Sequence, residues 1–349
     1  MTILKKILVS LVVCGMAIAV VPLNDVHAAD TRKKNDDLQT AEYITLGKTY
    51  KDSVGGLNSG DDYDYYTFTL TQTTTIRYNV KKSASATLYT YLYSASNNSL
   101  GYESVTQYVD YDKATDTSET TYARLPAGKY YLRVYTYDNT PVNYTFYVQK
   151  WTPEAQQITN VKSQTIEYEN PKYTALYLYP RAASYDFSYN SSNTKVLTVN
   201  ANGYVKTKAY GKATITITAK KPTSGYKNLK YKASTKKITI TVKPTNVSNA
   251  RLANYTTSKG KTKLLKKQLK VTWKRDKLAT GYQVEIAKNK GFTSGKKSVL
   301  IKTNKTTSKT FTKLKKGSKY YMRMRAYKTI NGKKVYGPWV KTPGTVKVY

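Results

Sequence analysis

Cysteine and histidine are almost absent from this chain of 349 residues. Its one cysteine is Cys14 and its one histidine is His27. Both fall in an N-terminal segment with the pattern of a bacterial export signal, so the mature chain would hold neither. We therefore expect no disulfide, no thiolate nucleophile and no zinc site built on these residue types. Serine triads that depend on histidine are excluded as well.

The export signal is predicted at residues 1–29. Lysines near the start precede an apolar core over residues 7–21, and a small-residue cleavage site follows at residues 26–28. The apolar core is short for a membrane span. We expect a secreted or cell-surface protein with no transmembrane segment in the mature chain, in which residues 30–40 form a disordered polar leader.

Acidic residues are scarce, and increasingly so toward the C-terminus. The formal net charge is +37, from 58 Lys and Arg against 21 Asp and Glu. Residues 41–150 have 10 basic and 11 acidic side chains, residues 151–243 have 15 and 4, and residues 244–349 have 28 and 2. The last region has too few acids to neutralise itself by internal salt bridges.

This excess of cations has two interpretations, solubility alone or adhesion to a polyanion. Adhesion would work through counterion release and would weaken steeply with salt. For an exported protein, the candidate partners are an anionic cell-wall polymer, a host glycan or matrix. No motif supports sequence-specific nucleic-acid binding. The predicted polyanion contacts are Lys263, Lys266, Lys267, Lys315, Lys316, Arg323 and Arg325.

Phenylalanine and tryptophan are few, at 5 and 3, but there are 36 tyrosines. Several alternate with aliphatic residues, so they would share the outer face of a strand. Strand propensity and cross-strand pairing are a sufficient structural reason. The functional alternative is an aromatic platform for sugars or collagen-like peptides, because tyrosine offers rigid amphipathic contact area. The platform would consist of Tyr89, Tyr91, Tyr93, Tyr131, Tyr135 and Tyr137. The sequence leaves open whether its two strands are neighbours.

Two stretches share a leucine, a glycine turn and a tyrosine-led run with period-two alternation, at residues 125–137 and 314–327. A weaker version begins at Gly211. This period is typical of half-buried strands. The predicted fold class is therefore all-β, with three tandem β-sandwich domains after a cleaved signal peptide.

The first domain is predicted at residues 41–150. It begins with DDYDYYTFTL from Asp61, continues with the strand LYTYLY from Leu88, and closes with LPAGKYYLRV from Leu125. These motifs resemble the bacterial pre-peptidase C-terminal domain family. The resemblance implies a jelly-roll-like β-sandwich that is appended to secreted proteins, and it implies no activity.

The second domain is predicted at residues 154–243. It contains FSYNSSN from Phe187, an Asn202-Gly203 pair between apolar runs, and GKATITI from Gly211. An Asn-Gly pair in this setting is a strong hairpin signal. The segment resembles the group 2 bacterial immunoglobulin-like family, which also occurs in intimin- and invasin-type surface proteins.

The third domain is predicted at residues 245–349. Its marks are LKVTW from Leu269, GYQVEI from Gly281 and YGPW from Tyr336. Between the last two, a leucine stands six residues before Tyr320, the spacing of a tyrosine corner. In this order the marks resemble a fibronectin type III domain, a seven-stranded sandwich. A lysine-rich insertion leaves the position of its first strand open.

Acidic side chains cluster at Asp61, Asp62 and Asp64, and again at Asp110, Asp112 and Asp116. Oxygen ligands suit Ca²⁺, so the first cluster is a calcium candidate and Ca²⁺ is the one cofactor that we consider. The alternative is that these carboxylates cap turns through backbone N–H groups. Neither cluster has the glycine and distal glutamate of an EF-hand loop.

Together these patterns predict an exported, non-catalytic protein that binds extracellular polymers through a cationic C-terminal half and a tyrosine-rich first module. Linked modules would raise the effective affinity. The alternatives are a passive structural spacer of the cell surface, or an accessory partner of a separate secreted hydrolase. Catalysis by paired carboxylates is disfavoured, because the acids lie in predicted turns of accessory-type domains.

Overall fold

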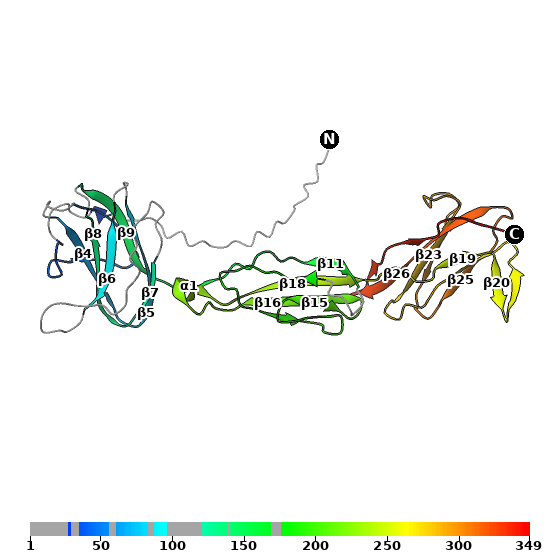
Figure 1. The fold of residues 1–349 in the computed structure, drawn as a ribbon, viewed down its shortest axis with the longest axis horizontal. Coiled ribbons are helices and arrows are strands. Elements are labelled where there is room, and N and C mark those ends of the chain that lie inside the picture. Colours follow the sequence, from blue (N-terminus) through cyan, green and yellow to red (C-terminus); the bar gives the residue numbers. More distant parts are fainter. Residues whose placement is uncertain are drawn as a thin grey trace, which may run out of the picture. The chain divides into compact units, whose positions relative to one another are not determined.

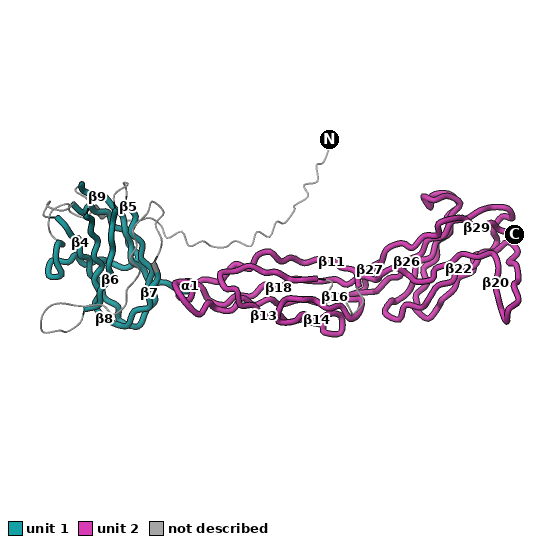
Figure 2. Tube along the Cα trace, viewed as in Figure 1, with its two compact units in different colours: residues 1–153 teal, residues 154–349 magenta. Residues whose placement is uncertain are grey.

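The structure is a computed structural model that describes residues 27–28, 35–55, 61–82, 87–95, 121–137, 140–168 and 176–349. The apolar core of the predicted export signal and the second acidic cluster, Asp110, Asp112 and Asp116, lie outside these ranges. The chain divides into two compact units, residues 1–153 and 154–349 (Figure 2). Among the described residues, no helix has the length and apolar character needed to cross a membrane.

Unit 1 consists of two β-sheets, and Figure 1 labels most of their strands. One sheet has the order β1-β3-β9-β5-β7, with strands His27–Ala28, Thr49–Val54, Val142–Lys150, Thr74–Lys82 and Thr121–Leu125. The other has the order β2-β4-β8-β6, with strands Glu42–Tyr43, Tyr63–Leu70, Gly128–Tyr135 and Tyr89–Ser94. β1 coincides with the predicted cleavage site, so cleavage there would remove its pairing with β3.

The core of unit 1 is made by alternate residues of these strands. Tyr66 and Phe68 on β4 and Leu132 on β8 are fully buried. The ring of Tyr66 lies 4.2 Å from that of Phe146 on β9, so side chains of the two sheets meet. The period-two pattern thus buries one face of each strand, as the sequence predicts.

Two details of unit 1 differ from expectation. Residues 35–40, assigned to a disordered leader, are ordered: Asn35 is buried and its carbonyl accepts the backbone N–H of Tyr65 at 2.7 Å. The tyrosine-corner hydrogen bond, expected at Tyr320 in the third domain, is instead made here by Tyr130, whose hydroxyl donates to the Pro126 carbonyl at 2.9 Å. For Tyr320, which is buried, the structure gives no hydroxyl hydrogen bond.

The first part of unit 2 covers the predicted second domain. A four-stranded sheet has the order β11-β18-β16-β13, with strands Gln164–Glu167, Ser234–Lys243, Gly211–Ala219 and Phe187–Ser191. A three-stranded sheet has the order β12-β15-β14, with strands Leu176–Tyr177, Tyr204–Thr207 and Leu197–Val199. The short helix α1 (Gly225–Lys230) precedes β17 (Tyr231–Lys232), which pairs with β10 (Glu154–Ala155).

The predicted Asn202-Gly203 hairpin joins β14 to β15. Gly203 has a φ of +84°, and a Cβ there would lie 2.5 Å from the Leu178 carbonyl oxygen. Glycine is therefore required both for the left-handed backbone and for the close approach of a neighbouring strand.

The second part of unit 2 covers the predicted third domain. One sheet has the order β19-β22-β25, with strands Arg251–Ala253, Leu269–Thr272 and Ser308–Phe311. The larger sheet has the order β24-β23-β26-β27, with strands Lys297–Ile301, Gly281–Ala287, Lys319–Ile330 and Lys333–Tyr336. β28 (Val340–Lys341) and β29 (Val346–Lys347) also pair with β26.

The lysine-rich insertion of the third domain forms a hairpin of its own, β20 (Tyr255–Ser258) and β21 (Lys261–Leu264). β19 precedes it and is the first strand, whose position the sequence left open. The all-β fold class, with several β-sandwiches, is confirmed. The separation of residues 154–243 from 245–349 stays a prediction, because both parts belong to one compact unit.

Candidate binding surfaces

Two adjacent strands, β6 and β8, bring the predicted platform tyrosines onto one face of unit 1. β8 lies between β4 and β6 in its sheet (Figure 1). Tyr89 on β6 pairs in register with Tyr135 on β8, and Tyr93 pairs with Tyr131. Tyr137 follows β8, and its ring lies 5.2 Å from that of Tyr135. The two strands whose arrangement the sequence left open are therefore direct neighbours.

The third strand adds two tyrosines that the sequence reasoning missed. Tyr63 and Tyr65 on β4 stand opposite Tyr135 and Arg133 of β8. Both alternate with the inward-facing Tyr66, so the period-two pattern could have identified them. We define the tyrosine face as Tyr63, Tyr65, Tyr89, Tyr91, Tyr93, Tyr131, Arg133, Tyr135 and Tyr137.

The tyrosine face is not the flat, open platform that the sequence predicts. Tyr131 and Tyr135 are only 7% and 3% exposed. Neighbouring rings cover Tyr135, with Tyr89 stacked at 5.0 Å and Tyr91 at 5.8 Å. This burial, together with hydrogen bonds to Tyr91 and Tyr137, raises the pKa of Tyr135 far above its usual range. Contact with a ligand would therefore fall on the more exposed rings, such as Tyr137 at 54%.

Arg133 lies among the rings of the tyrosine face. Its guanidinium carbon is 4.8–5.4 Å from four tyrosine ring centroids, within the range of cation–π attraction. Nη1 donates a 3.4 Å hydrogen bond to the Tyr65 hydroxyl. Nε is shielded from solvent and has no hydrogen-bond partner. In the part of unit 1 that the structure describes, no carboxylate forms an ion pair with Arg133.

A buried acid lies on the inner side of the same sheet. Asp64 on β4 is 2% exposed, and its carboxyl group forms a hydrogen bond with the Tyr144 hydroxyl at 2.5 Å. The Tyr144 and Tyr66 hydroxyls are 2.6 Å apart, and Tyr66 donates to Asp52 at 2.5 Å. Burial raises the pKa of Asp64 to about 8, against the opposing effect of the Tyr144 hydrogen bond.

This network also indicates where a proton resides. Its three oxygen–oxygen contacts require three protons, and the two tyrosine hydroxyls supply only two. One of the two carboxyl groups, Asp52 or Asp64, must supply the third and must then donate to its tyrosine. The raised pKa of Asp64 favours that residue, in which case Asp64 donates to Tyr144, Tyr144 to Tyr66 and Tyr66 to Asp52. Unit 1 therefore buries an acid in neutral form, with a hydroxyl as its partner.

The calcium candidate has a different membership from the one predicted. Carboxylate oxygens of Asp36, Asp61 and Asp64 lie within 4.8 Å of one another, whereas Asp62 is not part of this group. Asp61 also accepts the Gly55 backbone N–H at 3.1 Å, and burial raises its pKa. Three clustered carboxyl groups would fit a hard divalent cation such as Ca²⁺ once Asp64 has released its proton. Calcium binding here stays a prediction, now with Asp36 in place of Asp62.

Four of the predicted polyanion contacts come together at one end of unit 2, and a fifth, Lys263, lies on the preceding β20–β21 hairpin. The backbone N–H of Leu314 donates to the Lys267 carbonyl at 3.0 Å, and the Lys267 N–H donates to the Tyr349 carbonyl at 2.6 Å. These bonds place the segment before β22 beside the turn before β26. We define the lysine end as the exposed side chains of Lys263, Lys266, Lys267, Lys315 and Lys316.

Both acids of residues 244–349 already have partners other than lysine. Asp276 accepts the Tyr210 hydroxyl and the Leu278 backbone N–H, each at 2.9 Å. Glu285 is 3% exposed and pairs with Arg323 at 2.6 Å. Throughout this fully described region, no lysine has a carboxylate within salt-bridge distance. The cations of the lysine end therefore form no ion pair with any described carboxylate.

The remaining two predicted contacts, Arg323 and Arg325, belong to a packed ladder instead. Arg323 directs Nε and Nη2 to Glu285, both at 2.6 Å. Its guanidinium carbon lies 4.4 Å from the Phe292 ring centroid and 4.3 Å from that of Trp339. Such a sandwiched, ion-paired arginine is poorly placed to contact a polyanion.

Arg325 continues the ladder. Its Nε and Nη2 donate to Gln283 Oε1 at 2.9 and 2.7 Å, and its guanidinium carbon lies 3.8 Å from the Tyr336 ring centroid and 4.2 Å from that of Trp339. Burial lowers the pKa of Arg325. We define the arginine ladder as Gln283, Glu285, Phe292, Arg323, Arg325, Tyr336 and Trp339. The sequence assigned both arginines to polyanion binding from charge alone; that assignment stays a prediction, and the packing of the two side chains disfavours it.

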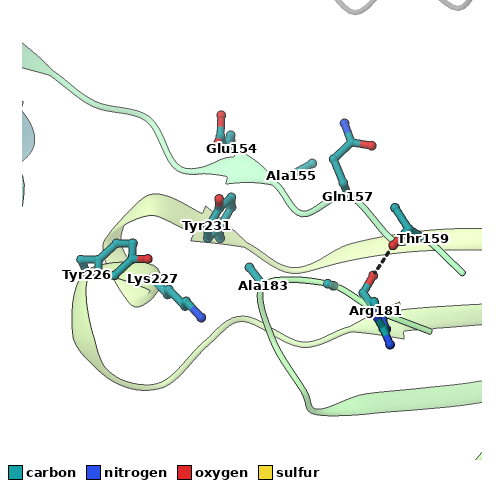
Figure 3. Close-up of a pocket in the computed structure, with 10 residues that line it drawn as sticks. Glu154, Ala155, Gln157, Thr159, Arg181, Ala183, Tyr226, Lys227 and Tyr231 are labelled. Atoms are coloured by element: carbon teal, nitrogen blue, oxygen red, sulfur yellow. Dashed lines mark hydrogen bonds between the residues drawn. The ribbon is translucent and has the colours of Figure 1, made fainter. Parts of the chain in front are cut away.

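A cavity of about 470 Å³ lies beside α1, and no sequence prediction fell on it (Figure 3). The Thr159 hydroxyl donates to the Arg181 carbonyl at 3.4 Å and joins two lining segments. Tyr226, which is 56% exposed, and Lys227 come from α1, and Glu154 adds an acid. Its mixed charge suits a small polar ligand, without indicating one class.

Together, the sheets and surfaces define a modular β-sandwich protein. Residues 156–230 match the family model for the bacterial Ig-like domain (group 2), within the range predicted for the second domain. That resemblance is confirmed for this segment, and domains of the group are typical of bacterial surface proteins. No curated protein matches the chain.

The chain is also similar to solved structures. The pre-peptidase C-terminal domain of a collagenase from Bacillus anthracis shares 25% identity over 34% of this chain and 100% of its own, with a TM-score of 0.26. A two-domain fibronectin type III segment from chicken tenascin shares 14% identity over 56% of this chain and 99% of its own, with a TM-score of 0.31. The chicken CNTN1 FN1–FN3 domains share 13% sequence identity over 84% of this chain and 98% of their own, with a TM-score of 0.24.

Proposed function

We propose that this protein is an exported, non-catalytic adhesion protein that binds extracellular polymers. The lysine end holds an anionic polymer, such as a cell-wall polymer, a host glycan or matrix, and the tyrosine face makes a second contact. The observation that carries the proposal is that both acidic side chains of residues 244–349 are used by other groups, so the structure gives these lysines no ion pair with a described residue. Each lysine near an anionic surface contributes about 1 kcal/mol at low salt.

The test compares three forms of the full chain on heparin and on purified anionic cell-wall polymer. One variant changes the five residues of the lysine end to glutamine. The matched control makes the same change at five exposed lysines elsewhere in unit 2, namely Lys195, Lys206, Lys208, Lys212 and Lys221. Retention is measured across a range of salt concentrations.

We expect the lysine-end variant to lose most binding and to lower the slope of log affinity against log salt by about 3 to 5. The control should keep most of its binding, because its lysines are spread over other surfaces. Equal losses in the two variants would mean that charge acts without a site, and the solubility interpretation would then be preferred.

A further inference from the structure

We infer that the tyrosine face binds an acidic polysaccharide, with the carboxylate or sulfate of the sugar on Arg133. The inference rests on the proposed function of the tyrosine face and names the class of polymer that it takes. Its evidence is the placement of one guanidinium among aromatic rings, with no carboxylate partner among the described residues.

The first step concerns charge. Arginine has five N–H donors, and Arg133 uses one of them, from Nη1 to the Tyr65 hydroxyl. The cation is held by four rings within 5.4 Å, but no described residue of unit 1 supplies a carboxylate to it. A half-buried cation without an anion is costly to the fold, so an external anion would gain a charge-assisted, bidentate partner.

The second step concerns access. Arg133 is intermediate in burial, on the outer face of its sheet, so solvent reaches part of the side chain. The same sheet presents the rings of Tyr63, 37% exposed, and Tyr137, 54% exposed. An anion could therefore approach the guanidinium between rings that remain open to a ligand.

The third step concerns the body of the ligand. The rings present apolar faces with hydroxyl groups at their edges, and a pyranose has the same pattern, with an apolar C–H face and a hydroxyl rim. Several such rings side by side match a chain of sugars better than a single anion. An acidic sugar in a chain supplies both partners, a ring face for tyrosine and an anion for Arg133.

The test uses oligogalacturonate and its methyl ester, which share the sugar chain and differ in whether the carboxyl group is a charged carboxylate or an uncharged ester. Chondroitin with and without sulfate forms a second matched pair and separates sulfate from carboxylate. The full chain carries lysine-to-glutamine changes at the lysine end, so that its cations do not contribute. Binding is measured by calorimetry for this background and for its Arg133→Gln, Arg77→Gln and Tyr137→Ala derivatives, with thermal melting as the fold control.

We expect the background protein to bind the acid about tenfold more tightly than the ester. Arg133→Gln should bring the ratio of the two affinities close to one. Arg77→Gln removes the same charge from β5 in the other sheet and should leave the ratio unchanged. Tyr137→Ala should weaken the binding of the acid and of the ester by a similar factor, because it removes a ring that contacts the sugar in both.

If the acid preference survives Arg133→Gln, the inference is wrong while the tyrosine face still binds glycan. If neither member of either pair binds to any form, the proposed function of this face fails instead. Binding of an acidic peptide, but of no glycan, would also overturn the assignment of the ligand class.

Discussion

Unit 1 and unit 2 each pack arginine against aromatic rings on the outer face of a sheet, but they balance the charge differently. In unit 2, Arg323 lies between Phe292 and Trp339 and pairs with the buried carboxylate of Glu285. In unit 1, Arg133 has four tyrosine rings around it and no described carboxylate. The charge of Arg323 is therefore balanced within the protein, whereas Arg133, like Arg325, is held by rings and a neutral hydrogen-bond partner without a described carboxylate.

The buried acids of the two units also differ in their partners. Glu285 has a cation beside it, whereas Asp64 has a tyrosine hydroxyl and lies within 4.8 Å of two further carboxylates. Burying an unpaired charge costs free energy, and a protein selected for stability alone would pair it or remove it. Unit 2 thus balances the charges of Arg323 and Glu285 against each other, whereas the described part of unit 1 favours the neutral form of Asp64 and gives Arg133 no carboxylate.

The largest effect on folding stability should come from removing the carboxylate of the arginine ladder. Glu285→Gln leaves Arg323 without its anion, and we expect it to destabilise the protein by about 3 kcal/mol. The matched control is Asp186→Asn, which breaks an exposed pair with Lys220 and should cost less than about 1 kcal/mol. Urea denaturation of both variants measures the difference. Equal, small losses would show that the ladder contributes little to the fold.

The next effect concerns Asp64 and pH. Its folded pKa of about 8 lies above the usual value of 3.8, so between these values the folded state binds more protons than the unfolded state. Its contribution to stability is therefore complete below about pH 4 and is lost as pH rises through about 8. Asp64→Asn removes the ionisable group and should raise stability at pH 9, on the order of 2 kcal/mol, and flatten the pH dependence.

Chemical denaturation at pH 5 and pH 9, in the presence of a chelator, measures this change. The variant should gain stability over the wild type only at the higher pH. An unchanged pH profile in Asp64→Asn would place the retained proton of the network on Asp52.

A smaller effect is expected from calcium. Ca²⁺ bound by carboxylates of the folded state should raise the melting temperature of unit 1, by an amount that corresponds to about 1 to 3 kcal/mol at high occupancy. Asp61→Asn should abolish the rise, whereas Asp62→Asn should preserve it, because only Asp61 belongs to the cluster. Calorimetry with Ca²⁺ and with EDTA tests both variants. If both substitutions reduced the Ca²⁺-dependent rise in melting temperature equally, Asp62 would belong to the calcium site, as the sequence predicts.

The sequence predicts the outward stripes well, because period-two alternation is local. Tyr91 and Tyr135 follow from it directly, and Arg133 occupies the same outward row. The pattern does not predict that Arg133 has no described carboxylate partner, because this depends on which strands become neighbours. Asp36 was missed for the same reason: it reaches Asp61 only because the Asn35 carbonyl accepts the Tyr65 N–H.

The lysine end and the ladder show the limit of reasoning from charge. The pairs at Lys266-Lys267 and Lys315-Lys316 were predicted from local density, and the backbone bond between Leu314 and Lys267 joins them. Arg323 carries the same formal charge, but its rings and carboxylate come from distant parts of the chain. Composition therefore identifies cations, and only tertiary packing separates exposed ones from paired ones.

The difference between the paired Arg323 and the unpaired Arg133 is tested most directly by the free energy of unfolding of Arg133→Gln and Arg323→Gln. Both are measured by chemical denaturation of the full chain. Removing Arg323 leaves Glu285 buried and unpaired, so we expect a loss of about 3 kcal/mol. Removing Arg133 abandons ring contacts but leaves no charge unpaired, so we expect a loss below about 1 kcal/mol. Equal losses from the two substitutions would show that Arg133 serves the fold as Arg323 does, and would contradict the account of an open charge in unit 1.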